Sequence, residues 1–558
     1  EGKSYGYVAE ITTNNQRLEV RERIPFPIEN INGLEEYTLP TETIDSDNPL
    51  IIAKAAELVE GETDLFKAVF NLASWVEENV EYDLNTLTAS ASQKASWVLQ
   101  SKSGVCDEIS TLFIAMARSL GIPARFASGI SYTTSDLFEE NWQPHGWAEV
   151  YFPDIGWVSF DLTFGEFGYI DVTHIKLRDG YDPAEPATEY QWLANQVALQ
   201  PQQLSMNVII KEQGNFIPED ILLEQEILSP KVGFGSYNLI RGIVKNTAEH
   251  YTATTLHLTT PKEVEIIGRN RRNMLLEPKQ IKETYWVVKR KDSLDEKFQY
   301  TFPSLIYTEK NISVESSFQA LSNEKKYSQS EIENLNIIDE EKTYSRKIRF
   351  TCESPQIVEL DEDFTASCRI KNSGNTNLNE LNFCLDETCK VINLKINQEE
   401  HLQISKKHKQ AGWKKITLSA INDLVEKKDS LDYQAFDTPL IDIQTEYPKN
   451  LTYAESMEIN IRLKKDSYNV PKDVIVIIKG LGMENRWEID QLSEEELTLQ
   501  LDNPPISKNN RLQLTVMWKD HNDKLYSEHQ TLEFTGEADN FPDKFRMLIN
   551  KLINLFNI

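Results

Sequence analysis

The stretch Cys106-Asp-Glu-Ile-Ser-Thr-Leu-Phe-Ile-Ala-Met-Ala-Arg-Ser-Leu120 decides the fold of the first half of the chain, because it predicts the strongest helix. Its apolar residues recur at spacings of three and four, so they share one face that can be buried. Gly121 and Pro123 follow as a stop signal. The helix therefore begins at Cys106, where free N–H groups and the helix dipole favour a thiolate over a thiol.

The segments around this helix predict its fold class. Helical periodicity precedes it over Ile51–Val59 and Leu65–Val80. After Pro123 the apolar pattern changes to a period of two, which predicts strands over Ala124–Tyr132, Gly146–Phe152 and Gly156–Leu162. Helices followed by an antiparallel sheet define an α+β domain.

Two polar residues on these strands form a candidate catalytic set with Cys106. His145 opens one strand, and Asp161 lies on the next strand, which a short turn brings back alongside. Thiol catalysis needs a thiolate that attacks a carbonyl, an imidazole that moves the proton and a carboxylate that orients the ring. The alternatives are that Cys106 is a small buried cysteine and that His174 takes the place of His145.

The whole stretch from about residue 50 to residue 185 resembles the transglutaminase-like superfamily. The resemblance is carried by Gly104-Val-Cys106, Arg118, Gly121-Ile-Pro-Ala-Arg125, His145-Gly-Trp-Ala-Glu-Val-Tyr151 and Gly156-Trp157 with Asp161. It implies a papain-like fold in which Cys106 is the nucleophile, His145 the general base and acid, and Asp161 the orienting residue. The family usually has Ala where this chain has Gly146, a change that leaves the strand intact and could loosen it.

The remaining candidates for the site are substrate-binding residues. An oxyanion needs hydrogen-bond donors, of which the Cys106 N–H is one and an upstream group the second. Trp97, Gln100 and Tyr82 are candidates, although no spacing singles one out, and Trp97 and Trp147 are better suited to wall a hydrophobic cleft or the core. We expect no cofactor and no metal, calcium included, because no Asp-rich loop of the required kind is visible.

The other four cysteines predict a structural role. Cys352, Cys368, Cys384 and Cys389 lie within fewer than 40 residues, and the last two flank a four-residue hairpin tip. We expect disulfides 352–368 and 384–389, which imply an oxidising, extracytoplasmic setting. Reduced core thiols and a four-thiolate zinc site remain alternatives.

The pattern along the chain predicts several domains. From about residue 231 it is almost wholly strand-like, with turn signals every 8–12 residues, as in β-sandwiches. Residues 345–435 resemble the immunoglobulin-like modules of microbial surface proteins, which are usually spacers or adhesive modules. We expect a β arm or subdomain (1–45), an α+β papain-like transglutaminase core (46–200), a linker (201–230), three all-β immunoglobulin-like sandwiches (231–340, 341–435 and 436–536) and an amphipathic helix (537–558).

Composition limits the partners. A chain of 558 residues is too long for one core, and a net charge of −30 makes nucleic acid an unexpected partner. No window has the ~18–20 consecutive apolar residues of a membrane span. Because Glu1 is not Met and no apolar signal region follows it, we expect that the natural N-terminus has been removed. The apolar stripe of the last helix suits either a juxtamembrane segment or docking onto the last domain.

These features predict thiol-dependent acyl transfer on protein or peptide amides through a thioester on Cys106. An amine acceptor gives protein crosslinking, and water gives hydrolysis. The alternatives are a cysteine peptidase of the cell envelope and a non-catalytic adhesive or scaffold protein. We expect an extracellular, cell-surface location, with membrane anchoring through the termini.

Overall fold

The computed structural model describes residues 8–14, 18–31, 33–86, 93–185, 207–217, 219–291, 295, 297–335 and 342–556. The chain divides into two compact units. One contains residues 1–349 together with 370–381 and 392–400, and the other contains 350–369, 382–391 and 401–558.

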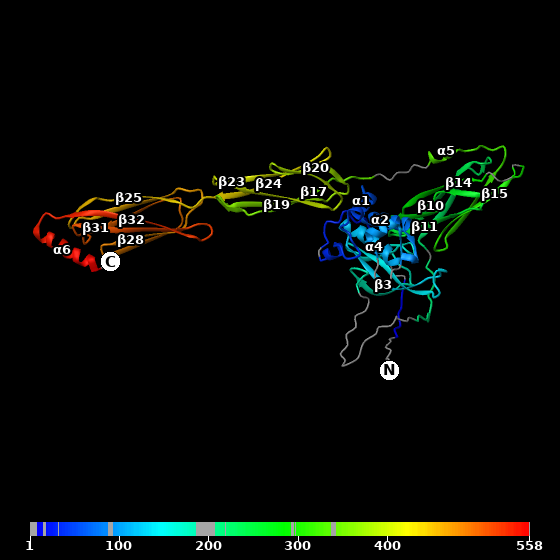
Figure 1. Cartoon of the computed structure of the whole chain (residues 1–558), viewed down its shortest axis with the longest axis horizontal. Helices are drawn as coiled ribbons and strands as arrows, with labels where there is room; N and C mark the ends of the chain where they lie inside the picture. Colours follow the sequence, from blue (N-terminus) through cyan, green and yellow to red (C-terminus); the bar gives the residue numbers. More distant parts are fainter. Residues whose placement is uncertain are drawn as a thin grey trace. The chain divides into compact units, whose positions relative to one another are not determined.

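The helices of the transglutaminase-like region surround α4 (Figure 1). Asn48 and Asp64 cap α1 and α2, because their side chains accept hydrogen bonds from the N–H groups of Leu50 and Phe66. The apolar face predicted for α4 is buried, with Leu112, Phe113 and Met116 fully enclosed. The bounds are η1 Glu35–Thr38, α1 Pro49–Val59, α2 Leu65–Asn79, η2 Leu84–Thr86, α3 Ala95–Ser101 and α4 Cys106–Ser119.

The five-stranded sheet of this region has the order β6-β5-β4-β3-β7, and α4 packs against β3 and β4. Arg118, which is buried, ties the domain together by donating to the carbonyls of Ala124, Leu39 and Tyr181. The bounds are β3 Ala124–Tyr132, β4 Trp142–Phe152, β5 Gly156–Asp161, β6 Glu166–Phe167 and β7 Ile175–Gly180. A separate parallel pair comprises β1 Glu81–Tyr82 and β2 Ser103–Gly104.

The segment before residue 45 differs from the predicted β arm. Its described residues contain no strand, and one isolated bridge joins Pro25 to Asp64. Instead, the separate side chains of Val20, Phe26 and Ile44 are buried in the core of the transglutaminase-like region. Successive prolines prevent a continuous ladder, so this segment covers the domain rather than forming a sheet of its own.

The first sandwich begins earlier than predicted. Strand β8 pairs with β10, so the predicted linker 201–230 ends before Ile221. Its sheets have the orders β12-β14-β10-β8 and β13-β11-β15-β16-β9. The bounds are β8 Ile221–Ile227, β9 Lys231–Val232, β10 Tyr237–Asn246, β11 Thr252–Thr259, β12 Val264–Ile267, β13 Arg271–Leu276, β14 Ile281–Arg290, β15 Tyr300–Thr308 and β16 Ser313–Ala320, followed by α5 Gln329–Glu333.

The first sandwich also shares a core with the transglutaminase-like region. Tyr251, Ala253 and Leu275 belong to the same buried cluster as the helices α1, α2 and α4. The Tyr251 hydroxyl donates to Asp64, and its ring lies 5.4 Å from that of Phe66. These contacts continue the core of the transglutaminase-like region into strands β11 and β13.

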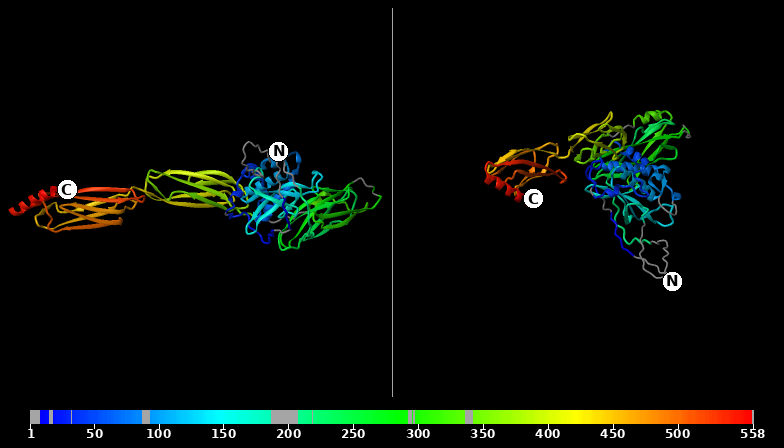
Figure 2. Two further views of the ribbon diagram at one scale, coloured as in Figure 1. Left: turned by 90° about the horizontal axis from the view of Figure 1, so that it is seen from below. Right: turned by 60° about the vertical axis from the view of Figure 1, so that its left-hand side comes forward.

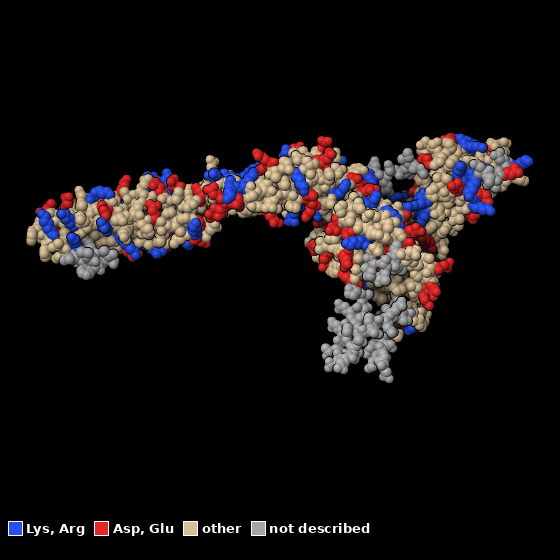
Figure 3. Space-filling model, viewed as in Figure 1, with Lys and Arg blue, Asp and Glu red and all other residues tan. Residues whose placement is uncertain are grey.

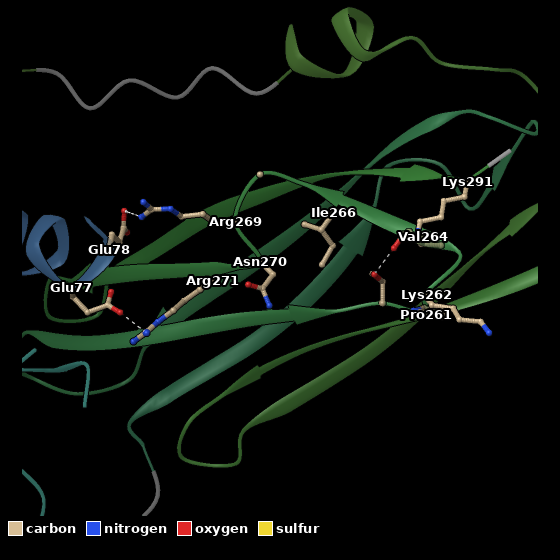
Figure 4. Close-up of a pocket in the computed structure, with 12 residues that line it drawn as sticks. Glu77, Glu78, Pro261, Lys262, Val264, Ile266, Arg269, Asn270, Arg271 and Lys291 are labelled. Carbon is tan, nitrogen blue, oxygen red and sulfur yellow. Dashed lines mark hydrogen bonds and ion pairs between the residues drawn. The ribbon is translucent and has the colours of Figure 1, made fainter. Parts of the chain in front are cut away.

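Ion pairs border a depression of about 530 Å³ at the same boundary (Figure 4). Arg271 pairs with Glu77 at 2.5 Å and Arg269 with Glu78 at 2.6 Å, so cations of the sandwich meet carboxylates of α2. These two ion pairs join α2 to the first sandwich, and Lys262 and Lys291 line the other end of the depression.

The second sandwich has the predicted disulfides. Cys352 is bonded to Cys368 and Cys384 to Cys389, which confirms both pairings. The sheets have the orders β17-β19-β22 and β18-β24-β23-β20-β21. The bounds are β17 Ile348–Glu353, β18 Ile357–Glu359, β19 Asp363–Asn372, β20 Leu378–Leu385, β21 Thr388–Leu394, β22 Glu399–Lys407, β23 Gly412–Ile421 and β24 Glu426–Phe436.

The turn after β19 contacts the loop between α1 and α2. The Asn375 carbonyl accepts from Gly61 N–H at 2.9 Å, and its side chain donates to the Glu62 carbonyl at 2.7 Å. Thr376 adds a bond to the Glu60 carboxylate at 2.7 Å. A polar turn that reads as an ordinary loop in the sequence is therefore a docking element.

The third sandwich has its own core, which is made of residues from 441 to 534 (Figure 2 shows the two layers). Its sheets have the orders β25-β27-β30 and β26-β32-β31-β28-β29. The bounds are β25 Ile441–Glu446, β26 Asn450–Thr452, β27 Met457–Lys465, β28 Lys472–Gly480, β29 Met483–Gln491, β30 Glu494–Leu501, β31 Asn509–Lys519 and β32 Leu525–Glu537, followed by α6 Phe541–Phe556. Among the described helices, none has the length and apolar character needed to span a membrane.

Candidate active site

Cys106 is the first residue of α4, as predicted, and two contacts fix the backbone before it. Strand β2 pairs with β1, which places Tyr82 opposite Gly104. The buried carboxylate of Glu108 accepts from the N–H of Val105 at 2.9 Å. A Cβ on Gly104 would lie 2.9 Å from that of Glu108, so glycine permits this close approach. Cys106 is therefore held by a short sheet on one side and a helix on the other.

The surroundings of the Cys106 sulfur favour a thiol. Burial raises its pKa well above the ordinary value, and the charge of Asp107 raises it further. A hydrogen bond from the Gly146 backbone N–H acts in the opposite direction. The thiol lies 3.6 Å from Asp107 Oδ1. The helix start alone predicts a thiolate, but the structure adds burial and a neighbouring carboxylate that sequence spacing does not reveal.

Steric crowding explains why this chain has Gly146 where the family usually has alanine. A Cβ built on it would lie 2.4 Å from Phe126 Cζ and 2.5 Å from Asp107 Oδ1. The space that the usual alanine methyl would need is therefore occupied by the carboxylate beside Cys106. The strand is continuous at the glycine, as predicted, since Gly146 pairs in register with Ser128.

His145 and Asp161 meet across the antiparallel strands β4 and β5. His145 Nε2 lies 2.5 Å from Asp161 Oδ2. The other carboxylate oxygen, Oδ1, accepts from the backbone N–H groups of Thr163 and Phe164 at 2.9 and 3.3 Å. Burial alone would raise the pKa of Asp161, but the nearby histidine rings outweigh it and hold that pKa well below its usual range. Asp161 is therefore an ionised acceptor.

A second histidine contacts the same carboxylate oxygen. His174, which precedes β7, places Nε2 2.9 Å from Asp161 Oδ2 and Nδ1 3.0 Å from Asp171 Oδ1. It does not replace His145 but joins it. The sequence indicated His174 only as an alternative, because no periodic pattern in the loop before β7 reveals which way the ring faces.

The four predicted substrate-binding residues fall into two groups. Tyr82 is near the site, since the charges of Cys106, Asp107 and Asp161 add to burial in raising its pKa, so its hydroxyl stays protonated. Trp147 is fully buried, and its ring centroid lies 6.2 Å from that of His145 and 5.4 Å from that of His174.

Trp97 and Gln100 lie elsewhere. They line a surface depression of about 670 Å³ on α3, together with Gln93, Lys94, Ser96 and Ser101, and no member of the catalytic set lines it. Trp97 is 39% exposed, and the Gln100 amide donates to the Ser96 carbonyl at 3.1 Å. The structure therefore brings Tyr82 and Trp147 to the site, but not Trp97 or Gln100.

Two groups in this region have the residue types of a metal site, namely His145, Asp161 and His174, and Glu166, Asp171 and His174. In the first group both Nε2 atoms are directed at one carboxylate oxygen at hydrogen-bonding distance. Each nitrogen then carries a proton, which a metal would have to displace. We therefore assign the cluster to a hydrogen-bond network.

Comparison with known proteins identifies this region. Residues 52–162 match the family model of the transglutaminase-like superfamily. This part of the chain is therefore a transglutaminase-like core of the papain-like thiol-enzyme type, which confirms the resemblance carried by the motifs. The helices, strands and sheet orders likewise confirm the α+β prediction for the core and the sandwich prediction for the later chain.

Individual relatives are distant. The uncharacterized protein YebA of Bacillus subtilis (strain 168) is 28% identical over 149 residues, which cover 24% of this chain and 20% of YebA. A candidate cysteine protease from Cytophaga hutchinsonii is 22% identical, with a TM-score of 0.24, over 31% of this chain and 55% of that chain. The titin I-band fragment I67–I69 is 12% identical, with a TM-score of 0.20, over 57% of this chain and 99% of the fragment. This chain thus matches only a minor part of YebA.

Proposed function

We propose that this protein is a thiol-dependent acyltransferase or hydrolase that acts on protein or peptide amides. The observation that carries the proposal is the 2.5 Å contact between His145 and Asp161, on strands packed beside the helix that begins at Cys106. An imidazole oriented by an ionised carboxylate can take the thiol proton, which the environment of Cys106 otherwise retains.

The reaction proceeds in two steps. His145 accepts the Cys106 proton while the sulfur attacks the amide carbon, and the carbonyl electrons move onto oxygen. The Cys106 N–H and the Tyr82 hydroxyl are the proposed donors to that oxyanion. Its collapse breaks the C–N bond, the imidazolium of His145 protonates the leaving amine, and a thioester remains.

The acceptor decides the outcome. A lysine amine that attacks the thioester gives an isopeptide crosslink, whereas water gives the free acid, and either attack returns the sulfur as a thiol. A cysteine peptidase of the cell envelope would use the same groups on a backbone amide. A scaffold that only binds would use none of them.

Incorporation of a fluorescent primary amine into a glutamine-bearing protein tests these alternatives. We expect labelling that is lost in Cys106→Ala and His145→Ala and kept in His401→Ala, a control at an exposed histidine of the second sandwich. Peptide release without labelling would support the peptidase. Neither activity in the wild-type protein would contradict catalysis and favour the scaffold.

We also propose an extracytoplasmic location. The disulfides Cys352–Cys368 and Cys384–Cys389 support it, because such bonds persist in oxidising compartments. Charges of both signs are interspersed over the face of the sandwiches seen in Figure 3, as expected for a solvated envelope protein. Alkylation of the denatured native protein should count one thiol before reduction and five after it. Five thiols without reductant would contradict this location.

Helix α6 is the proposed membrane contact. Met547 is buried and Asn550 donates to the Ile506 carbonyl, so one side docks on the last sandwich. The exposed side carries apolar residues and basic neighbours, a combination that suits an anionic lipid surface. These residues are Phe541, Phe545, Leu548 and Ile549, with Lys544, Arg546 and Lys551.

Vesicle sedimentation tests the membrane contact. We expect binding to phosphatidylglycerol vesicles, weaker binding to phosphatidylcholine, and loss of binding in Phe545→Glu/Leu548→Glu. Val391→Glu, at an exposed apolar residue of the second sandwich, is the control. Equal binding by the α6 variant would contradict the role of this helix.

A further inference from the structure

The catalytic carboxylate is shared between two imidazole rings. Asp161 Oδ2 lies 2.5 Å from His145 Nε2 and 2.9 Å from His174 Nε2. An ionised carboxylate oxygen only accepts hydrogen bonds, so both ring nitrogens must carry protons. The orienting residue is therefore held by two donors on one oxygen, in addition to the two backbone N–H groups on the other.

The second nitrogen of His174 decides its charge. Nδ1 lies 3.0 Å from Asp171 Oδ1 and 3.8 Å from Glu166 Oε2. Asp171 Oδ1 also accepts from the N–H and hydroxyl of Thr173, at 2.8 and 2.6 Å, as an ionised oxygen does. Nδ1 must then donate as well. A ring that donates from both nitrogens is an imidazolium, so His174 is a buried cation between two carboxylates.

We propose that His174 is a positioning residue, a fixed imidazolium that clamps Asp161 and reduces the negative charge that His145 experiences. The proposal deepens the function proposed above and rests on it for the role of His145. Without this cation, Asp161 would stabilise the protonated His145 more strongly, and that ring would release its proton to the leaving amine less readily. His174 therefore balances two needs of His145, which must accept a proton and then return it.

The groups that face His174 are consistent with this role. Asp161 comes from β5, Glu166 from β6, Asp171 from the loop before β7, and His145 from β4. Burial lowers the pKa of His174, but Asp161, Asp171 and Glu166 outweigh it and raise that pKa to about 10. Burial raises the pKa of Glu166 to about 8, so this carboxyl is mostly uncharged at neutral pH. Trp147 and Phe164 pack around the ring and exclude water from it.

Nitrogen NMR of the full chain labelled in histidine tests the charge of His174 without requiring activity. The His174 resonances are assigned by their loss in His174→Gln. We expect both ring nitrogens to stay protonated from pH 5 to pH 9. A His174 ring that loses a proton near pH 6.5 would overturn the proposal.

The pH profile of Cys106 alkylation by iodoacetamide tests the effect on His145. In His174→Gln, whose amide can still donate to Asp161 without a charge, we expect the alkaline limb of the profile to move up by about one pH unit. Asp171→Asn removes an anion and leaves the His174 cation, so it should move the limb by less and in the opposite direction, and His401→Gln should not move it. A lower rate with an unmoved profile in both variants would show a merely structural residue and overturn the proposal.

The two experiments separate this inference from the proposed function. If the wild-type profile showed a thiol that titrates independently of His145, the proposed catalytic set would fail. The NMR experiment would still decide whether His174 is a permanent cation. Asp171→Asn, which changes a half-exposed side chain, keeps the alkylation test usable if His174→Gln does not fold.

Discussion

The first and third sandwiches share a two-sheet architecture but bury their apolar side chains in different ways. In the first sandwich, the side chains of Tyr251, Ala253 and Leu275 are buried in the cluster that contains α1, α2 and α4. The third keeps a core made of its own residues, from Ile441 to Phe534. Similar modules in one chain can therefore differ in role, because one completes a neighbouring domain and the other is complete alone. The two sandwiches are distinguished by what their buried side chains pack against, which is a neighbouring domain in the first and the sandwich itself in the third.

Truncation should give the largest difference between the two sandwiches. A chain that ends after residue 185 loses part of its core packing, so we expect it to be insoluble or to unfold without a cooperative transition. A chain that ends after residue 437 should keep the unfolding midpoint of the transglutaminase-like region within a few degrees. The unfolding transition of each chain is measured by heating it and monitoring when Cys106 becomes accessible to an alkylating reagent. A cooperative fold in the shorter chain would refute the shared core.

Matched core substitutions should give the next largest effect. Tyr251→Ala removes a buried ring and a hydrogen bond to Asp64, and should lower the free energy of unfolding of the transglutaminase-like region by about 3–5 kcal/mol. Phe534→Ala should lower the free energy of unfolding of the third sandwich by a similar amount and leave that of the transglutaminase-like region unchanged. Hydrogen exchange resolved by segment separates the two responses. If Tyr251→Ala destabilised only the first sandwich, the two regions would not share a core.

Disulfide removal should have an intermediate effect that is confined to the second sandwich. Cys352→Ser/Cys368→Ser opens a loop with a separation of 16 residues and should lower the free energy of unfolding by about 3 kcal/mol. Cys384→Ser/Cys389→Ser opens a separation of five and should cost about 2 kcal/mol. Denaturant unfolding of each variant measures these costs. Equal costs would argue against loop entropy as their origin.

The smallest effect is expected at position 146, where a substitution tests how tightly the strand packs beside Cys106. Gly146→Ala should cost about 1–3 kcal/mol, because its methyl would meet Phe126 and the Asp107 carboxylate. Part of this cost should disappear when Asp107→Ala is already present, and the third sandwich should not respond. A double-mutant cycle of unfolding free energies measures the coupling. Simple additivity would show that Asp107 does not fill the space.

The sequence predicted best the features that local chemistry specifies. The cysteine at a helix start, the histidine and aspartate on adjacent strands and both disulfide pairings could be inferred from residue type and spacing. The docking of Tyr251 on Asp64 and of Asn375 on Gly61 could not, because periodicity tells which residues are buried but not against what. The sequence indicates His174 only as an alternative to His145, because a loop has no periodic pattern that shows which way its side chains point. Trp97 and Gln100 lie on helix α3 and face a surface depression, and the sequence does not show which face of this short helix is directed at the site.

The shared core also has a consequence for the order of events during synthesis. Tyr251 follows Asp64 by 187 residues, so the helices of the transglutaminase-like region leave the ribosome well before the strand that completes their packing. At ~5–20 residues per second, this interval is roughly 10–40 s. During this interval the domain that contains Cys106 cannot complete its core. A chaperone or translocation machinery would therefore receive a chain that is not yet folded and whose site is not yet assembled. Emergence of strands β11 and β13 thus sets the earliest time at which this region can complete its core.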